Sequence, residues 1–209
     1  MGLDWNPMAR PKRGHEKEFA RLFRALEKYE PKEDDAKLAR FREISNAPFE
    51  TLGAPRVGID RAANAWLASR VKDKRKLAKV KASMKGYYVL DLLPECDGFP
   101  RYTNYGAYDG IDRYSFRAQF LNDVEMVLGD RLMTLAYKHM LADELARYGK
   151  AILGKARAFA KREGVTRVEK LREVDYDEES AESRAHIMFA AARWCLYWSK
   201  RGHGLEPYY

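Results

Sequence analysis

The sequence predicts an all-α fold, a single-domain multi-helix bundle of about six to seven helices with a long irregular polar-aromatic loop in the middle. Apolar residues recur at steps of three and four along most of the chain, which is the spacing of one helix face. The 209 residues are 46% hydrophobic, so one core can form without structural metals or disulfides. Glycines, prolines and tyrosines interrupt the helical spacing mainly at 94–114.

The N-terminal quarter predicts an irregular arm followed by a helical hairpin. Residues 1–14 contain Pro7 and Pro11, which favour irregular structure. Apolar residues then follow a helical spacing until Pro31: Phe19, Leu22, Phe23, Leu26 and Tyr29. A second helix is expected after the acidic residues 33–35, with an apolar stripe at Leu38, Phe41 and Ile44.

The next segment predicts a loop over 45–59 and then a helix for which Asp60 is the N-cap. The basic stretch that ends at Lys85 either continues this helix or restarts after a break. Residues 87–93 fit a short buried strand or a helical turn equally well.

The C-terminal half predicts four helices. Ser115 is the expected cap of the first, which ends near Gly129, and Asp130 opens the second. A third ends at Gly164. The last, from about Ser180 to Lys200, is apolar on most sides and is therefore expected to be the central, buried helix. Residues 201–209 form a C-terminal tail.

The net charge of +8 lies in the N-terminal part of this basic protein. Residues 1–90 hold 21 Lys and Arg against 12 Asp and Glu, whereas residues 91–209 hold 18 against 19. The densest cluster, which we call the basic stripe, comprises Arg70, Lys72, Lys74, Arg75, Lys76, Lys79, Lys81 and Lys85.

The basic stripe has two interpretations. On a helix its lysines would point outward and could neutralise phosphates of nucleic acid or face an anionic surface. No aromatic residue interleaves with the stripe, so a stacking platform for single strands is not expected. The alternative is a solvated helix face. A second basic run at 147–167 precedes an acidic run at 173–182, and we expect these two runs to neutralise each other.

The segment 91–114 is the most unusual in the chain. Its aromatic and guanidinium side chains are suited to binding a small molecule or a protein partner, and loops commonly carry such sites. The expected contacts are Arg101, Tyr102, Tyr105, Tyr108 and Arg113. The alternatives are a structural plug and a catalytic centre. Cys96 lies between two acidic residues, which would raise the pKa of its thiol and argue against a nucleophile.

Metal sites and cofactors are not expected. The four histidines are widely spread, and no Glu-x-x-His pair of a di-iron bundle is present. Glu182 with His186, and His139 with Asp143, are four residues apart, which favours hydrogen-bonded pairs over metal ligation. Phosphate-binding glycine motifs and nucleophile elbows are absent from the sequence.

These patterns identify no reaction, so whether the protein is an enzyme stays open. The leading hypothesis is a cytoplasmic, non-catalytic binding or interaction module that uses the 91–114 loop. A nucleic-acid-binding protein using the basic stripe is the alternative, and an enzyme with a site in the loop is the second alternative. No signal peptide is recognisable, and the longest apolar stretch, 187–198, is too short to cross a membrane.

Overall fold

The computed structural model describes residues 2–28, 35–92, 115–175, 177 and 179–209. It is mostly helical, which confirms the helical class. Within these residues it also contains two two-stranded antiparallel sheets, which the all-α prediction did not include. The chain divides into two compact units. The larger unit comprises residues 1–46 and 96–209, and the smaller unit comprises residues 47–95. That the 209 residues form a single domain stays a prediction.

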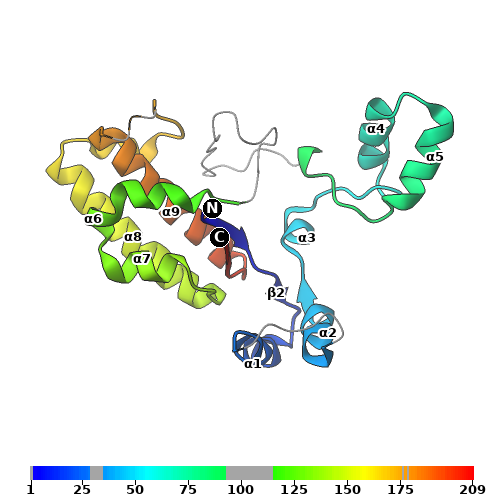
Figure 1. The fold of residues 1–209 in the computed structure, drawn as a ribbon, viewed down its shortest axis with the longest axis horizontal. Helices are drawn as coiled ribbons and strands as arrows, with labels where there is room; N and C mark the ends of the chain where they lie inside the picture. Colours follow the sequence, from blue (N-terminus) through cyan, green and yellow to red (C-terminus); the bar gives the residue numbers. More distant parts are fainter. Residues whose placement is uncertain (1, 29–34, 93–114, 176, 178) are drawn as a thin grey trace. The chain divides into compact units, whose positions relative to one another are not determined.

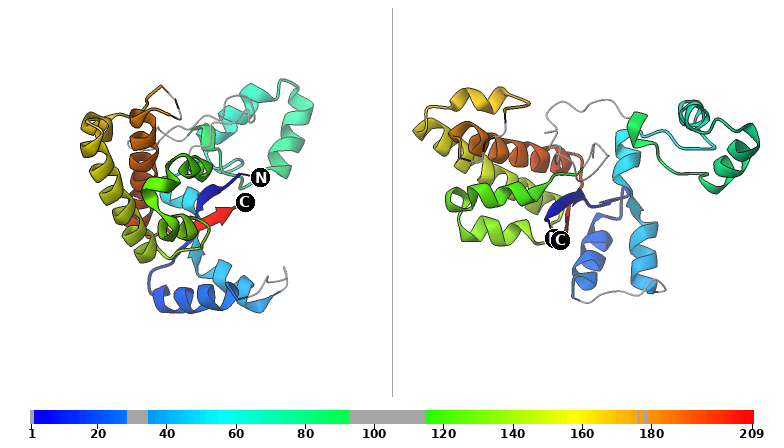
Figure 2. Two further views of the ribbon diagram at one scale, coloured as in Figure 1. Left: turned by 60° about the vertical axis from the view of Figure 1, so that its left-hand side comes forward. Right: turned by 45° about the horizontal axis from the view of Figure 1, so that its top comes forward.

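The larger unit is built on two long helices, α8 (Ala142–Arg162) and α9 (Ala181–Lys200), which run side by side (Figure 2). The side chain of Ser180 caps α9 by accepting a hydrogen bond from the Ser183 N–H at 3.1 Å. Most of α9 is buried, including Trp194 and Trp198, neither of which is exposed at all. The predicted central helix is therefore confirmed.

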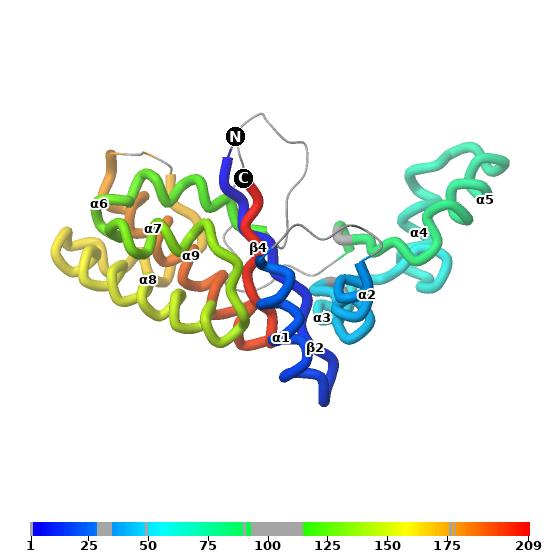
Figure 3. Tube along the Cα trace, turned by 60° about the horizontal axis from the view of Figure 1, so that its bottom comes forward, coloured from blue at the N-terminus to red at the C-terminus, as the bar shows by residue number. Residues whose placement is uncertain are grey.

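Strands lie near both termini, so the N-terminal segment is not wholly the irregular arm that the prolines predict. Strand β1 (Asp4–Pro7) pairs antiparallel with β4 (Leu205–Tyr208), and Figures 1 and 3 show the two ends side by side. The pairing joins residues about two hundred positions apart, so neither segment shows a local signal for it. A second short pair, β2 (Arg10–Pro11) with β3 (Ser45–Asn46), closes the base of the N-terminal hairpin.

The N-terminal helical hairpin forms as predicted from α1 (Glu16–Leu26) and α2 (Ala36–Glu43). The carboxylate of Asp35 caps α2 by accepting from the N–H groups of Lys37 and Leu38. Phe19 stacks on Phe41 with ring centroids 4.5 Å apart. The hairpin core also contains four other buried side chains: Met8, Leu22, Phe23 and Ile44.

The segment after residue 115 differs from the prediction, because Ser115 does not begin a helix. Phe116 instead exchanges two backbone hydrogen bonds with Trp5, at 2.8 and 2.9 Å. This bridge to the N-terminal strand holds the backbone extended. The chain then forms a 3₁₀ helix (Ala118–Val124), α6 (Glu125–Leu128) and α7 (Asp130–Ala136). Between α8 and α9 lies a further 3₁₀ helix (Thr166–Lys170).

The smaller unit contains α3 (Pro48–Leu52), α4 (Arg61–Arg70), α5 (Lys74–Ser83) and a 3₁₀ turn (Leu90–Leu92). Helix α4 begins directly after Asp60, although the Asp60 carboxylate accepts from the Arg56 N–H at 2.6 Å and caps no helical N–H. The basic stretch restarts as a separate helix after a break at residues 71–73.

Two glycines of α8 have opposite surroundings and give a matched test of the α8–α9 packing. A Cβ added at Gly149 would lie 2.6 Å from Cys195 Cβ, whereas one added at Gly154 would meet nothing within 4 Å. We expect Gly149→Ala to lower the free energy of unfolding by about 1–3 kcal/mol through overpacking. Gly154→Ala should raise it by about 0.5–1 kcal/mol through helix propensity. Urea unfolding of both variants measures the difference, and equal effects would contradict this packing.

His203 is a fully buried titratable group whose Nδ1–H donates to the Met8 carbonyl at 2.8 Å. Its ring lies edge-on to Trp198 at 5.1 Å. Burial lowers the pKa of His203 from 6.5 to about 4, and the nearby Arg10 and Arg201 act in the same direction. The unfolded chain therefore binds a proton at a higher pH than the folded chain does.

This difference predicts that the contribution of His203 to the free energy of unfolding is fully present above pH 6.5. That contribution is lost as the pH falls from 6.5 toward 4. From pH 7 to pH 5 the His203 contribution to the loss is about 2 kcal/mol. The variant His203→Asn keeps a donor for Met8 but does not titrate, so it should lose less stability over this interval. Chemical denaturation at both pH values measures the two losses; equal losses would contradict the prediction. Burial also lowers the pKa of His186. Because His186 is present in both proteins, it contributes equally to the two losses and does not affect their difference.

Candidate functional site

The loop contacts predicted from the sequence lie outside the described residues. These are Arg101, Tyr102, Tyr105, Tyr108 and Arg113, and the candidate thiol Cys96 lies outside them as well. Of the segment 91–114, the structure describes Asp91 and Leu92. The loop as a binding surface stays a prediction. The other cysteine, Cys195, is buried, and burial raises the pKa of its thiol, so it is not an activated nucleophile.

The smaller unit holds five residues of the basic stripe on helix α5: Lys74, Arg75, Lys76, Lys79 and Lys81. The Asp73 carboxylate caps α5 by accepting from the N–H of Arg75 at 2.8 Å and of Lys76 at 3.4 Å. Val57, Ala63, Leu67 and Val89 form a small buried core. The inner face of α5 packs against that core through Leu77, Val80 and Met84. Because Leu77, Val80 and Met84 face this core, the cations of α5 point outward, as the sequence predicts for the lysines of the basic stripe.

Seven cations of the stripe are exposed and make no ion pair with any residue that the structure describes. These are Lys72, Lys74, Arg75, Lys76, Lys79, Lys81 and Lys85. Arg70 differs, because it donates to Asp91 at 2.7 Å and lies over the Trp66 ring at 4.7 Å. The cations of the basic stripe that remain available to an anion are therefore these seven, which lie on α5 and directly before and after it.

The second basic run shows the opposite arrangement. Its arginines are engaged by nearby carboxylates: Arg147 with Asp143, Arg157 with Glu169, Arg162 with Glu163, and Arg167 with Glu182. The last pair joins the basic run to the acidic run, as the sequence predicts. Neutralisation at these positions argues against an anion-binding role for the four arginines, whereas the lysines of the run are not in these pairs.

The larger unit contains a groove that the sequence did not suggest. Its volume is about 890 Å³, and its lining residues come from the end of α1, from 128–140 and from the first half of α8. Leu128, Leu132, Met140 and Tyr148 are buried side chains that line it. The groove is therefore apolar at its base.

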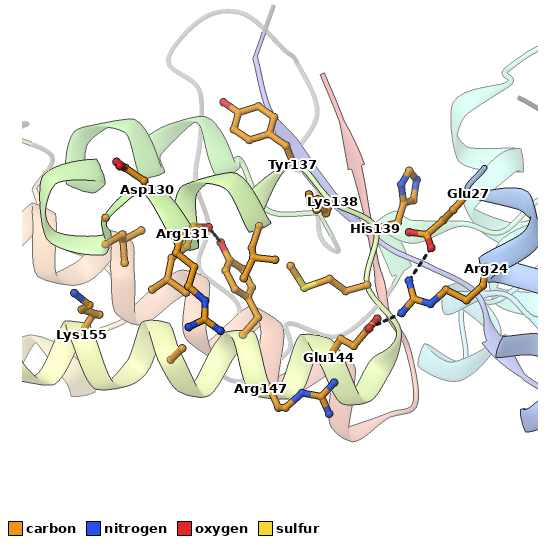
Figure 4. A pocket seen from close by; sticks show the side chains of 17 residues that line it. Arg24, Glu27, Asp130, Arg131, Tyr137, Lys138, His139, Glu144, Arg147 and Lys155 are labelled. Carbon is orange, nitrogen blue, oxygen red and sulfur yellow. Dashed lines mark hydrogen bonds and ion pairs between the residues drawn. The ribbon is translucent and has the colours of Figure 1, made fainter. Parts of the chain in front are cut away.

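One end of the groove is closed by a charged cluster that we call the Arg24 clamp. The Arg24 guanidinium donates to Glu144 and, at 2.7 Å, to Glu27 (Figure 4). Both carboxylates, Glu144 foremost, raise the pKa of Arg24. The clamp joins α1 to α8 and neutralises one of the two carboxylates at this end.

Three further cations line the groove without an ion pair to any described residue: Arg131, Lys138 and Lys155. Arg147 also lines it and pairs with Asp143 at 2.8 Å. Arg131 extends from α7 toward α8, on which Arg147 and Lys155 stand (Figure 4). Asp130 is the acidic lining residue outside the Arg24 clamp. The groove therefore carries excess positive charge above an apolar base.

Sequence reasoning missed the groove because three separate segments assemble it. A local signal exists only on α8, where Arg147, Ala151 and Lys155 follow at steps of four and share one helix face. His139 lines the groove and is exposed, with its ring 6.4 Å from that of Phe23.

The two histidine pairs considered for metal binding have other neighbours. Glu182 pairs with Arg167, and His186 Nε2 lies 2.9 Å from the Arg172 carbonyl oxygen. Asp143 pairs with Arg147. In the part of the chain that the structure describes, no three His, Cys, Asp or Glu side chains gather as metal ligands would. Nor does any helix in those residues combine the length and apolar character that crossing a membrane requires.

No family model matches the chain, and no curated protein or solved structure matches it either. The basic stripe and the groove are therefore the two surfaces whose chemistry indicates a function.

Proposed function

We propose that the protein binds double-stranded DNA through the α4–α5 hairpin, with α5 presenting the basic stripe to the phosphates. The observation that carries this proposal is the set of seven exposed cations without ion-pair partners among the described residues. Because the inner face of α5 is packed against a core, these cations form an ordered array. An ordered array can displace several counterions from a duplex at once.

The single carboxylate at the N-terminus of α5, the Asp73 cap, offsets only part of an unfavourable arrangement of charges on this helix. Its first turn contains Lys74, Arg75 and Lys76 and no acidic residue, although the helix dipole disfavours cations there by about 0.3–1 kcal/mol each. Lys79 follows Arg75 by four positions and Lys76 by three, so like charges also face each other. A row of phosphates along α5 would remove both costs, which supports a polyanionic partner over a merely solvated face.

The shape of α5 favours DNA over other nucleic acids. Ten residues make a helix about 15 Å long and, with side chains, about 10–12 Å wide. This fits the major groove of B-form DNA, which is about 12 Å wide. The deep, narrow major groove of A-form RNA does not admit such a helix. The stripe also lacks the interleaved aromatic residues on which single strands stack.

The test is a fluorescence-anisotropy titration of a labelled 24-base-pair duplex at several salt concentrations. We expect affinity to fall about 10³-fold between 50 and 200 mM salt. In the quadruple variant Arg75→Gln, Lys76→Gln, Lys79→Gln, Lys81→Gln, the slope of log K against log salt should weaken by about 3–4. Glutamine preserves helix propensity, and circular dichroism checks that α5 remains folded.

The matched control removes the same charge from exposed positions elsewhere: Lys150→Gln, Lys161→Gln, Lys170→Gln and Lys200→Gln. It should bind the duplex nearly as the parent protein does. An equal loss in the control would mean general charge attraction and would overturn the proposal. Salt-independent binding, absence of binding, or equal affinity for a single strand of the same length would overturn it too.

A further inference from the structure

We infer that the groove between α7 and α8 is a binding site for a small organic anion with an apolar body, such as an aromatic or aliphatic carboxylate, sulfonate or phosphate ester. This inference is independent of DNA binding, because it concerns different residues in the larger unit. It rests on three properties of the groove: its apolar base, its size, and its cations that pair with no carboxylate among the residues that the structure describes.

The base of the groove offers apolar surface and no unsatisfied charge. Leu128, Met140 and Tyr148 are each exposed by 3% or less yet line the groove. The Tyr148 hydroxyl donates to the Leu132 carbonyl at 3.0 Å, and burial raises its pKa, so it stays neutral. The partly buried Leu135 and the exposed Ala151 add apolar surface that water reaches, and a ligand's apolar group would displace that water.

The walls supply the charge that selects an anion. Arg131, Lys138 and Lys155 make no ion pair with the described residues, and Asp130 offsets one of them. The two other lining carboxylates, Glu27 and Glu144, share the single Arg24 guanidinium, so the Arg24 clamp keeps one net negative charge. With Arg147 paired to Asp143, the groove keeps one positive charge in excess. Apolar contact alone would not distinguish a neutral ligand from an anionic one with the same apolar body. We assign a negative group to the ligand because the groove has an excess of cations.

The size of the groove sets the class of ligand. About 890 Å³ lies within the range of about 300–1,000 Å³ typical of small-molecule sites. A ligand of two or three fused or linked rings, or a medium-length acyl chain, would cover the base and still place its charge beside Arg131. Inorganic phosphate or acetate would leave the apolar base uncovered, so we expect the groove to bind these ions weakly.

Two fluorescent probes test this assignment on the full chain. 8-Anilinonaphthalene-1-sulfonate carries a sulfonate, and N-phenyl-1-naphthylamine has the same aromatic body without that charge. We expect the sulfonate to bind at one site at least 10-fold more tightly than the neutral probe. Equal affinity of the two probes, or absence of saturable sulfonate binding, would overturn the inference.

A pair of variants at Ala151 localises the binding. Ala151 is an exposed residue of α8 that lines the groove, and both Glu and Gln are good helix formers. Ala151→Glu adds a carboxylate to the groove, whereas Ala151→Gln adds nearly the same bulk without charge. Sulfonate affinity should be at least 10-fold lower in Ala151→Glu than in Ala151→Gln, while the neutral probe should not distinguish them. Equal sulfonate affinity in the two variants would place the probe elsewhere and overturn the inference.

The cations are tested by the double variant Arg131→Gln, Lys155→Gln, which should weaken sulfonate binding by about 10-fold. Lys150→Gln is the matched control, since Lys150 is exposed on α8 but does not line the groove. Thermal unfolding of each variant shows that the fold is retained. A loss in Lys150→Gln as large as in the double variant would mean non-specific attraction and would overturn the inference.

Discussion

The indole of Trp5 joins segments that are far apart in the chain, and the larger unit depends on it. Its N–H donates to the Ala136 carbonyl at 2.9 Å, at the end of α7, and its backbone pairs with Phe116. Its ring contacts those of Tyr148 and Trp194, each with centroids 5.7 Å apart. One side chain on β1 therefore positions α7, α8 and α9. Removing a buried indole typically costs about 3–5 kcal/mol, a large part of the stability of a domain this size.

The groove is a consequence of this constraint. Its two walls are α7 and α8, and Trp5 bonds to the end of one and packs against Tyr148 on the other. The Met140 N–H donates to the Leu205 carbonyl at 3.0 Å, so β4 fixes the connection between the walls from its other end. The Arg24 clamp then attaches α1 to α8. Trp5, β4 and Arg24 thus hold the end of α7, the connection and the first turns of α8, which are the segments that carry most of the groove's lining residues.

Local patterns in the sequence predicted most of the helices, but not α3, which lies within the predicted loop 45–59, and not the contacts between distant segments. Periodicity predicted α1, α2 and α9, and the density of Lys and Arg alone marked the basic stripe before the structure was known. The strands at the termini were missed because their pairing partners lie at opposite ends of the chain. Ser115 was misassigned as a helix cap for the same reason, since the Phe116 backbone is held by Trp5. The groove needs three segments to meet, so no single window of sequence contains it.

Ion pairing distinguishes the cations that support the fold from those available to a ligand. An exposed ion pair adds little stability, about 0–1 kcal/mol, but it lowers the local potential that would attract an anion. The arginines of 147–167 are engaged in this way, and Arg24 is engaged twice. The cations of α5 lack such partners among the described residues, and so do Arg131, Lys138 and Lys155 in the groove.

The two sets of cations differ in the surface that surrounds them. On α5 the charges extend along a polar surface, which suits a row of phosphates. In the groove they surround buried apolar side chains, which suits a single charge on an apolar body. Cationic side chains therefore indicate a different ligand at each surface. The polarity of the surface between the charges determines which class of ligand fits.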